Sequence, residues 1–171
     1  MPSVRGDRLM PLTPVFVRPL LSTFARYLSR YQSLSRQQKN VLWASLFFLP
    51  LFWLGLRFFG LQRFQGWLDR SSVADRPPLN ADQAATIGAA VNIAATHAPG
   101  PVTCLTRSLL LRSFLRRLGT DSELRVGVQF AGGEFAAHAW VEVAGQPIND
   151  APDIATRYAA FDKPVSTSQF S

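Results

Sequence analysis

Two helices are predicted in the second half of the chain by apolar residues that recur at helical spacing. The first covers residues 81–95, where the apolar positions form one face, and Asn80 stands where it can cap the start. The second starts at or just before Cys104 and runs to residue 118, with Gly119 as its stop. Each helix therefore has one face to bury against a neighbouring element.

Strands follow these helices along the chain. Residues 124–130 and 135–143 alternate between apolar and polar positions, and a glycine-containing turn separates them. A second turn leads into a short third strand at 147–149, and residues 151–171 show no firm periodicity. Helices followed by antiparallel strands predict an α+β domain at 81–171, in which a small sheet packs against the helix that carries the only cysteine.

A continuous apolar segment at residues 41–69 precedes this domain. Sixteen residues from Val41 onward carry no charge, Pro50 is expected to kink the segment, and Arg57 interrupts it. A bilayer span needs roughly 20 apolar residues, so the segment falls short of a clear transmembrane helix. We interpret it as a pair of apolar helices that cover the domain or dock on a partner, with a membrane anchor or interfacial helix as the alternative. Residues 70–80 read as a linker to the domain.

Residues 1–40 form a basic N-terminal extension. Seven basic residues and one acidic residue lie there, and they account for six of the seven net positive charges. Four prolines in its first half oppose a long helix, whereas residues 20–31 have the pattern of a short basic amphipathic helix. No secretory cleavage site follows the apolar segment. We therefore expect a cytoplasmic protein, peripheral to the inner face of the membrane if the apolar segment meets lipid.

The composition excludes several classes of protein. The 171 residues are 47% hydrophobic and 17% charged, which excludes a disordered chain, and one apolar segment alone excludes a polytopic membrane protein. A single cysteine permits no intramolecular disulfide and no cysteine-based zinc site, and two histidines form no histidine-rich metal site. We therefore expect no metal or other cofactor. The basic residues lack a recognised nucleic-acid-binding module, so we expect no nucleic-acid partner.

Cys104 stands where a catalytic nucleophile is expected, within the first turn of its helix. Backbone N–H groups there lack intrahelical partners and the helix dipole is positive at this end, so a negative charge is favoured. The thiolate is the nucleophilic form of a cysteine. Taken alone, an unpaired cysteine is more often a small buried residue of the core, and this alternative stays open.

His138, in the middle of the second predicted strand, makes Cys104 a candidate nucleophile. Alternation places His138, Trp140 and Glu142 on one strand face, whereas the apolar residues at 135, 137, 139, 141 and 143 are expected to be core. Small alanines beside the histidine leave room for a substrate chain, and we assign Trp140 to substrate binding. A histidine on a strand near the helix with the only cysteine is a candidate general base.

A cysteine–histidine pair needs a third group that orients the imidazole ring. Asp150 follows the third predicted strand, which can return the chain beside His138. Asp153 is the rival, but it follows Pro152, which cannot donate a ladder hydrogen bond, so we expect it in a loop. Glu142 shares the face of His138 but lies four residues along, about 13 Å at strand rise, which is too far.

The motifs around these residues resemble those of the lasso-peptide leader peptidases, a branch of the transglutaminase-like, papain-type cysteine proteases. Three segments within residues 79–150 carry the resemblance: CLTRSLLLRSFLRRLG, ELRVGVQF and FAAHAWVEVAGQPIND. The family pattern is a Cys-Leu-x-Arg-Ser helix ending at Gly, a Gly-Val strand, and an Ala-His-Ala-Trp-Val-Glu strand followed by an acid. A looser likeness extends to residues 40–69, since members of the family carry apolar helices upstream.

This resemblance implies a transglutaminase-like core, with Cys104 as the nucleophile, His138 as general base and then acid, and Asp150 as the orienting acid. The enzyme would cut the leader peptide from a lasso-peptide precursor, and an asparagine-synthetase-like cyclase would then close the macrolactam. Some members carry a leader-recognition domain on the same chain, for which residues 1–40 are too short and too rich in proline. We therefore expect the split form, whose partner is a separate leader-recognition protein.

Two other functions stay open at this point. The first is another transglutaminase-like acyl-transfer enzyme or an amidase, distinguished by whether product release consumes water or an amine. The second is a non-catalytic, membrane-associated binding module. In that module Cys104 would be buried, and its thiol would resist alkylation.

Overall fold

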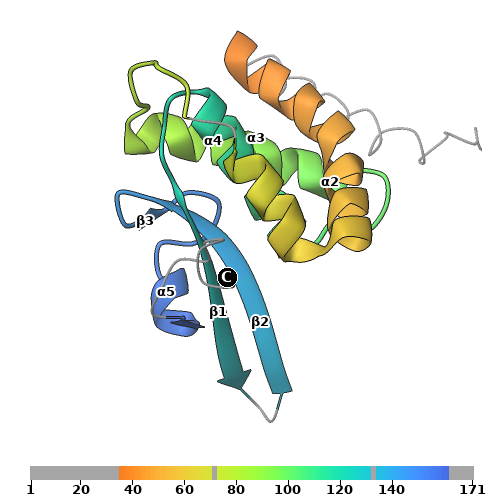
Figure 1. Ribbon diagram of the computed structural model, residues 1–171. Coiled ribbons are helices and arrows are strands. Elements are labelled where there is room, and N and C mark those ends of the chain that lie inside the picture. Colours follow the sequence, from red (N-terminus) through yellow and green to blue (C-terminus); the bar gives the residue numbers. More distant parts are fainter. Residues whose placement is uncertain (1–34, 71–72, 132–133, 162–171) are drawn as a thin grey trace, which may run out of the picture. The chain divides into compact units, whose positions relative to one another are not determined.

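The computed structural model describes residues 35–70, 73–131 and 134–161 (Figure 1). The basic extension up to residue 34, with its predicted helix at 20–31, lies outside these residues. In chain order the elements are α2 (Arg36–Asp69), α3 (Ala81–His97), α4 (Cys104–Arg117), β1 (Glu123–Ala131), β2 (Glu134–Val143), β3 (Gln146–Pro147), α5 (Ile154–Arg157) and β4 (Ala159–Ala160). Helices that precede a small antiparallel sheet confirm the predicted α+β fold class.

In each of α2, α3 and α4 the side chain of the residue just before the helix caps its first turn. Ser35 and Asn80 form capping boxes with the glutamine three residues later, and the hydroxyl of Thr103 accepts a hydrogen bond from the backbone N–H of Thr106. These caps satisfy N–H groups that have no partner within the helix. Because Thr103 caps α4, the helix starts at Cys104, as the sequence predicts.

The helical backbone of α2 is interrupted at Gly60, a position that the sequence pattern does not single out. Gly60 has φ 72° and ψ 167°, a region that only glycine reaches without a steric penalty. Pro50 lies inside α2, where it has no N–H to donate to the preceding turn, and the kink predicted there stays a prediction. We call residues 36–59 the first arm of α2 and residues 61–69 the second arm (Figure 1).

A hydrophobic core joins the helices to the inner part of the sheet. Ile87 and Val91 of α3 pack with Leu111 and Leu115 of α4 and with Val141 of β2. All five side chains are buried. The segment at 73–80 has no helix or strand, and it is held by backbone and side-chain hydrogen bonds to the end of α4 and the residues that follow. The core therefore fixes α4 against β2, the two elements that carry the candidate cysteine and histidine.

The sheet has the strand order β3-β2-β1-β4, with every pair antiparallel. In the long β1–β2 hairpin, Gly127 lies opposite His138 and Phe130 opposite Phe135. Figure 1 shows the end of β1 and the start of β2 extending away from the helices. Residues 134–137 are exposed on both strand faces, so the prediction that positions 135 and 137 belong to the core is wrong. From Ala139 to Val143 every position of β2 is buried, so both strand faces are covered there and Trp140 and Glu142 do not form an open polar face.

Candidate active site

Cys104 is the first residue of α4, and its thiol is free and partly buried. Thr103 caps the same turn through its hydroxyl. The backbone N–H of Cys104 belongs to the group of N–H donors at a helix start that have no acceptor within the helix. The thiol therefore lies at the positive end of the helix dipole, an environment that stabilises a negative charge.

His138 and Asp150 form a hydrogen-bonded pair beside this helix. The ring nitrogen Nε2 of His138 lies 2.7 Å from Oδ2 of Asp150. An ionised carboxylate only accepts hydrogen bonds, so Nε2 donates and Nδ1 is left as the basic nitrogen. The other oxygen of the carboxylate, Oδ1, accepts the backbone N–H of Ala151 at 3.0 Å. The acid therefore fixes both the orientation and the tautomer of the ring.

Two residues of α4 connect the cysteine helix to this pair. Arg107 Nη2 lies 3.3 Å from Asp150 Oδ2, and Ser108 Oγ donates to the carbonyl of Ala139 at 3.0 Å. Positions three and four residues after Cys104 share its helix face, one turn further along. The face that begins with Cys104 therefore points to the strand position next to His138.

The structure brings His138 and Asp150 into direct contact. Cys104 lies one helical turn, about 5 Å along the axis of α4, before Arg107 and Ser108, the two residues of its helix face that bond to Asp150 and β2. Among the described residues, no hydrogen bond joins the thiol to the His138 ring. Catalytic hydrogen bonds are often long or poorly aligned before substrate binds. The roles of the three side chains stay predictions.

A buried asparagine fixes the backbone next to the acid. Asn149 accepts the backbone N–H of Val141 through Oδ1 at 2.8 Å and donates through Nδ2 to Ser108 Oγ at 3.0 Å. Its own carbonyl accepts a hydrogen bond from the side-chain amide of Asn92 at 2.9 Å. These contacts join α3, α4 and β2 at one point, so the following residue, Asp150, is held by three elements.

A family comparison covers the part of the chain that carries these residues. The model of the transglutaminase-like superfamily matches residues 47–162, about two thirds of the chain. The chain belongs to the transglutaminase-like superfamily. Residues 104, 138 and 150 all lie within the matched range.

One relative agrees with the resemblance that the sequence motifs indicate. The chain is 45% identical over 51 residues to the microcin J25-processing protein McjB of Escherichia coli. The aligned part is 30% of this chain and 24% of that protein, so the match spans about a quarter of the relative's length. No solved structure matches the chain at a significant level. The resemblance to lasso-peptide processing proteins is therefore confirmed over part of the chain.

The sequence pattern assigns Trp140 to substrate binding, but its side chain is 0% exposed and cannot contact a substrate directly. The indole N–H donates to Glu142 Oε1 at 2.8 Å, and the ring stacks on His138 with 6.5 Å between centroids and 20° between planes. Glu142 also accepts Arg125 Nε at 3.1 Å, so it fixes the tryptophan and does not contact the histidine. In this transglutaminase-like site Trp140 supports the imidazole ring from the side of the core.

Tyr158 is a site residue that the sequence pattern did not reveal. Its ring lies 5.2 Å from the His138 ring, centroid to centroid, and comes from the end of α5. The last part of the chain shows no periodicity because α5 and β4 are only four and two residues long. Among residues 35–70, 73–131 and 134–161, no group of three or more histidine, cysteine or acidic side chains could hold a metal ion.

If His138 is catalytic, Gly127→Ala should lower turnover by about tenfold or more. A Cβ at Gly127 would lie 2.9 Å from Tyr158 Cβ and 3.0 Å from the Trp140 ring, so both aromatic side chains would have to shift. Overpacking of this kind costs about 1–3 kcal/mol of stability. Because both rings contact His138, the imidazole would move with them.

Steady-state kinetics and urea unfolding of the variant measure the two effects. Glu134→Gln, at an exposed position of the same hairpin away from His138, is the control and should change neither turnover nor stability. Full activity of Gly127→Ala would show that the aromatic packing does not position His138.

Proposed function

We propose that the protein is a cysteine peptidase that removes the leader from a lasso-peptide precursor before a partner cyclase closes the macrolactam. The observation that carries the proposal is the hydrogen-bonded His138–Asp150 pair, which is tied through Arg107 to the helix that begins with Cys104. The partial match to McjB supports the substrate class, since that protein is described as processing microcin J25. Membership in the transglutaminase-like superfamily supports acyl chemistry on a cysteine.

Acylation uses the three side chains in sequence. Nδ1 of His138 takes the proton of the Cys104 thiol, and the sulfur attacks the carbonyl carbon of the scissile peptide bond. The backbone N–H of Cys104, which has no acceptor within α4, donates to the developing oxyanion. The imidazolium then protonates the leaving amine, which departs as the new N-terminus of the core peptide. The leader remains on the cysteine as a thioester.

Deacylation reverses the proton path with water as the nucleophile. Nδ1 of His138 removes a proton from water, and the hydroxide attacks the thioester carbonyl. The C–S bond breaks, the leader is released with a new carboxylate, and the imidazolium returns its proton to the Cys104 sulfur. Throughout both steps Asp150 accepts from Nε2 and stabilises the imidazolium that forms. Water as the acyl acceptor distinguishes this peptidase from the alternative, a transglutaminase-like enzyme that transfers the acyl group to an amine.

The proposed partners follow from the proposed reaction. The leader peptide of the precursor is the substrate, a separate leader-recognition protein presents it, and an asparagine-synthetase-like cyclase consumes the released core. A cytoplasmic location suits this sequence of steps, because the precursor is made by ribosomes and is processed before export.

The test is mass spectrometry of precursor peptides encoded beside this gene, incubated with the purified protein and its encoded partners. We expect cleavage at one site, and in water enriched with heavy oxygen the new carboxylate of the leader should carry one labelled atom. An amine-linked leader would support the acyl-transfer enzyme instead. Alkylation by iodoacetamide tests the remaining alternative, a non-catalytic binding module. A Cys104 thiol that does not react, in a protein without turnover, would support that module.

A further inference from the structure

One face of the first arm of α2 is a row of exposed apolar side chains. The buried positions of this arm, among them Leu49 and Phe52, lie on the side that meets α3 and α4. The exposed residues recur three or four positions apart, so they share the opposite side. They are Trp43, Phe47, Leu51, Leu54 and Phe58, and exposure reaches 76% at Phe58. We call this set, with Phe59 and Trp67 beyond it, the apolar row.

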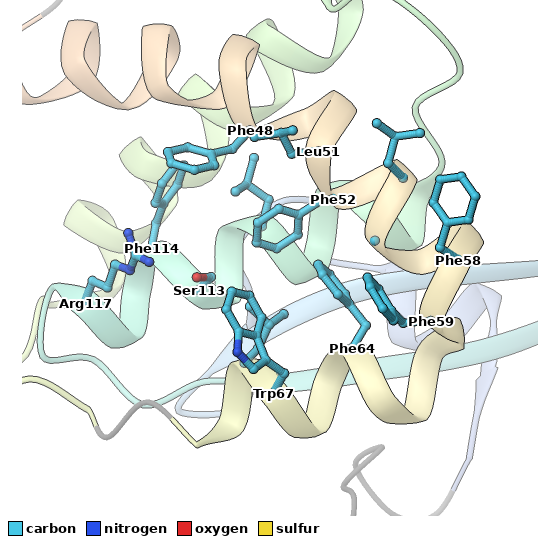
Figure 2. A pocket seen from close by; sticks show the side chains of 14 residues that line it. Phe48, Leu51, Phe52, Phe58, Phe59, Phe64, Trp67, Ser113, Phe114 and Arg117 are labelled. Atoms are coloured by element: carbon cyan, nitrogen blue, oxygen red, sulfur yellow. The ribbon is translucent and has the colours of Figure 1, made fainter.

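An apolar cavity opens within this surface, between the two arms of α2 and α4. Its volume is about 440 Å³, and Leu51, Phe58, Phe59 and Trp67 of the apolar row line it. Figure 2 shows the rings of Phe52, Phe64 and Trp67 gathered between the arms. The cavity has room for part of a hydrocarbon chain, and among its lining residues only Ser113 and Arg117 are polar or charged.

Positive charge surrounds the apolar row. Residues 36–69 contain four basic side chains and a single acidic one. Arg57 and Arg63 are exposed on either side of the break at Gly60, next to Phe58 and Phe59. The acidic residue, Asp69, is engaged by Arg112, whose Nη1 lies 2.7 Å from its carboxylate. Exposed aromatic residues flanked by arginine are typical of helices that lie in the headgroup region of anionic membranes.

We infer that the apolar row is a docking surface for an anionic lipid bilayer, on which α2 lies in the membrane interface. By length and composition α2 as a whole could cross a membrane, and 28% of its most apolar stretch is buried in the protein. A helix of the soluble core would be mostly buried. A full span is excluded because the opposite side of the arm packs on α3 and α4.

This docking mode leaves the candidate active site free. Cys104, Arg107 and Ser108 lie on the side of α4 that meets β2 and Asp150, whereas Leu110 and Phe114 line the cavity on another side. The inference does not depend on the proposed peptidase function, because the two surfaces share no residue.

The test is flotation of the full-length protein with lipid vesicles. Wild-type protein should float with phosphatidylcholine vesicles that contain phosphatidylglycerol, and weakly or not at all with pure phosphatidylcholine. Added salt should weaken binding, because the attraction between exposed charges is screened. Phe58→Ser/Phe59→Ser should weaken binding by about tenfold or more, because two large side chains no longer enter the interface. Arg57→Gln/Arg63→Gln should remove the preference for phosphatidylglycerol.

Phe130→Ser/Phe135→Ser is the matched control, since these two rings are equally exposed but lie on the hairpin. It should bind vesicles as wild type does, and circular dichroism should show each variant folded. Wild-type protein that does not float overturns the inference. Equal loss of binding in the control also overturns it, because exposed phenylalanine at any place would then suffice. A stable dimer or a soluble complex with the cyclase, without vesicle binding, would show that the apolar row contacts protein.

Discussion

Cys104→Ala should abolish cleavage of the leader while the fold is retained. Cys104 is the only cysteine of the chain, and it is the first residue of α4. Without it no thioester can form, so turnover should fall to the uncatalysed background. The side chain is only partly buried and the change removes one atom, so stability should change by about 1 kcal/mol or less.

Mass spectrometry of the precursor after incubation with the variant measures the loss, and urea unfolding measures the stability. Binding of the precursor should persist, because the backbone and the face of α4 are unchanged. Cleavage at the wild-type rate by purified Cys104→Ala would end the cysteine-peptidase proposal and leave the family membership intact.

Asp150→Asn should lower kcat by roughly a hundred- to ten-thousand-fold, with a small effect on KM. The reason is the tautomer of His138. In the wild type the carboxylate accepts from Nε2, which leaves Nδ1 basic. An asparagine amide can donate to Nε2 and thereby stabilise the tautomer that carries its proton on Nδ1, the wrong nitrogen to accept a proton from the thiol. The variant also loses the charge that Arg107 contacts.

Asp153→Asn is the matched control for this experiment. Asp153 is exposed at the start of α5, and among the described residues its side chain makes no hydrogen bond with His138. Its kcat should lie within about twofold of wild type, because surface substitutions away from special contacts have small effects. A silent Asp150→Asn together with a damaged Asp153→Asn would reverse the assignment of the third residue.

The helices and the first two strands could be predicted because their signals are local. A cap, a periodic apolar face and a stop residue define α3 and α4 without reference to the rest of the chain. The pairing of His138 with Asp150 could be anticipated because only a short turn separates β2 from the segment that returns beside it. These are contacts between residues that are near in sequence, for which the possible geometries are few.

The remaining features of the site depend on contacts that no local pattern encodes. Trp140 reads as a residue of a polar strand face, but its side chain is fully buried, donates to Glu142 and stacks on His138. Asn149 ends the third predicted strand, but in the structure β3 stops at Pro147, and the side chain of Asn149 bonds to β2 and α4 while its backbone carbonyl accepts from α3. In α2 the proline signal was stronger than the glycine signal, although a positive φ at Gly60 ends the helical path.

The two ends of β2 differ in how freely their length can change during evolution. Between His138 and Asp150 the chain passes a tight turn at Ala144–Gly145 and then the buried Asn149. One inserted residue there would move every following side chain to the opposite strand face and separate the acid from the ring. The turn end of the hairpin carries no such constraint, because residues 134–137 are exposed. Laboratory evolution of this protein should therefore accept inserted residues between β1 and β2 without separating His138 from Asp150.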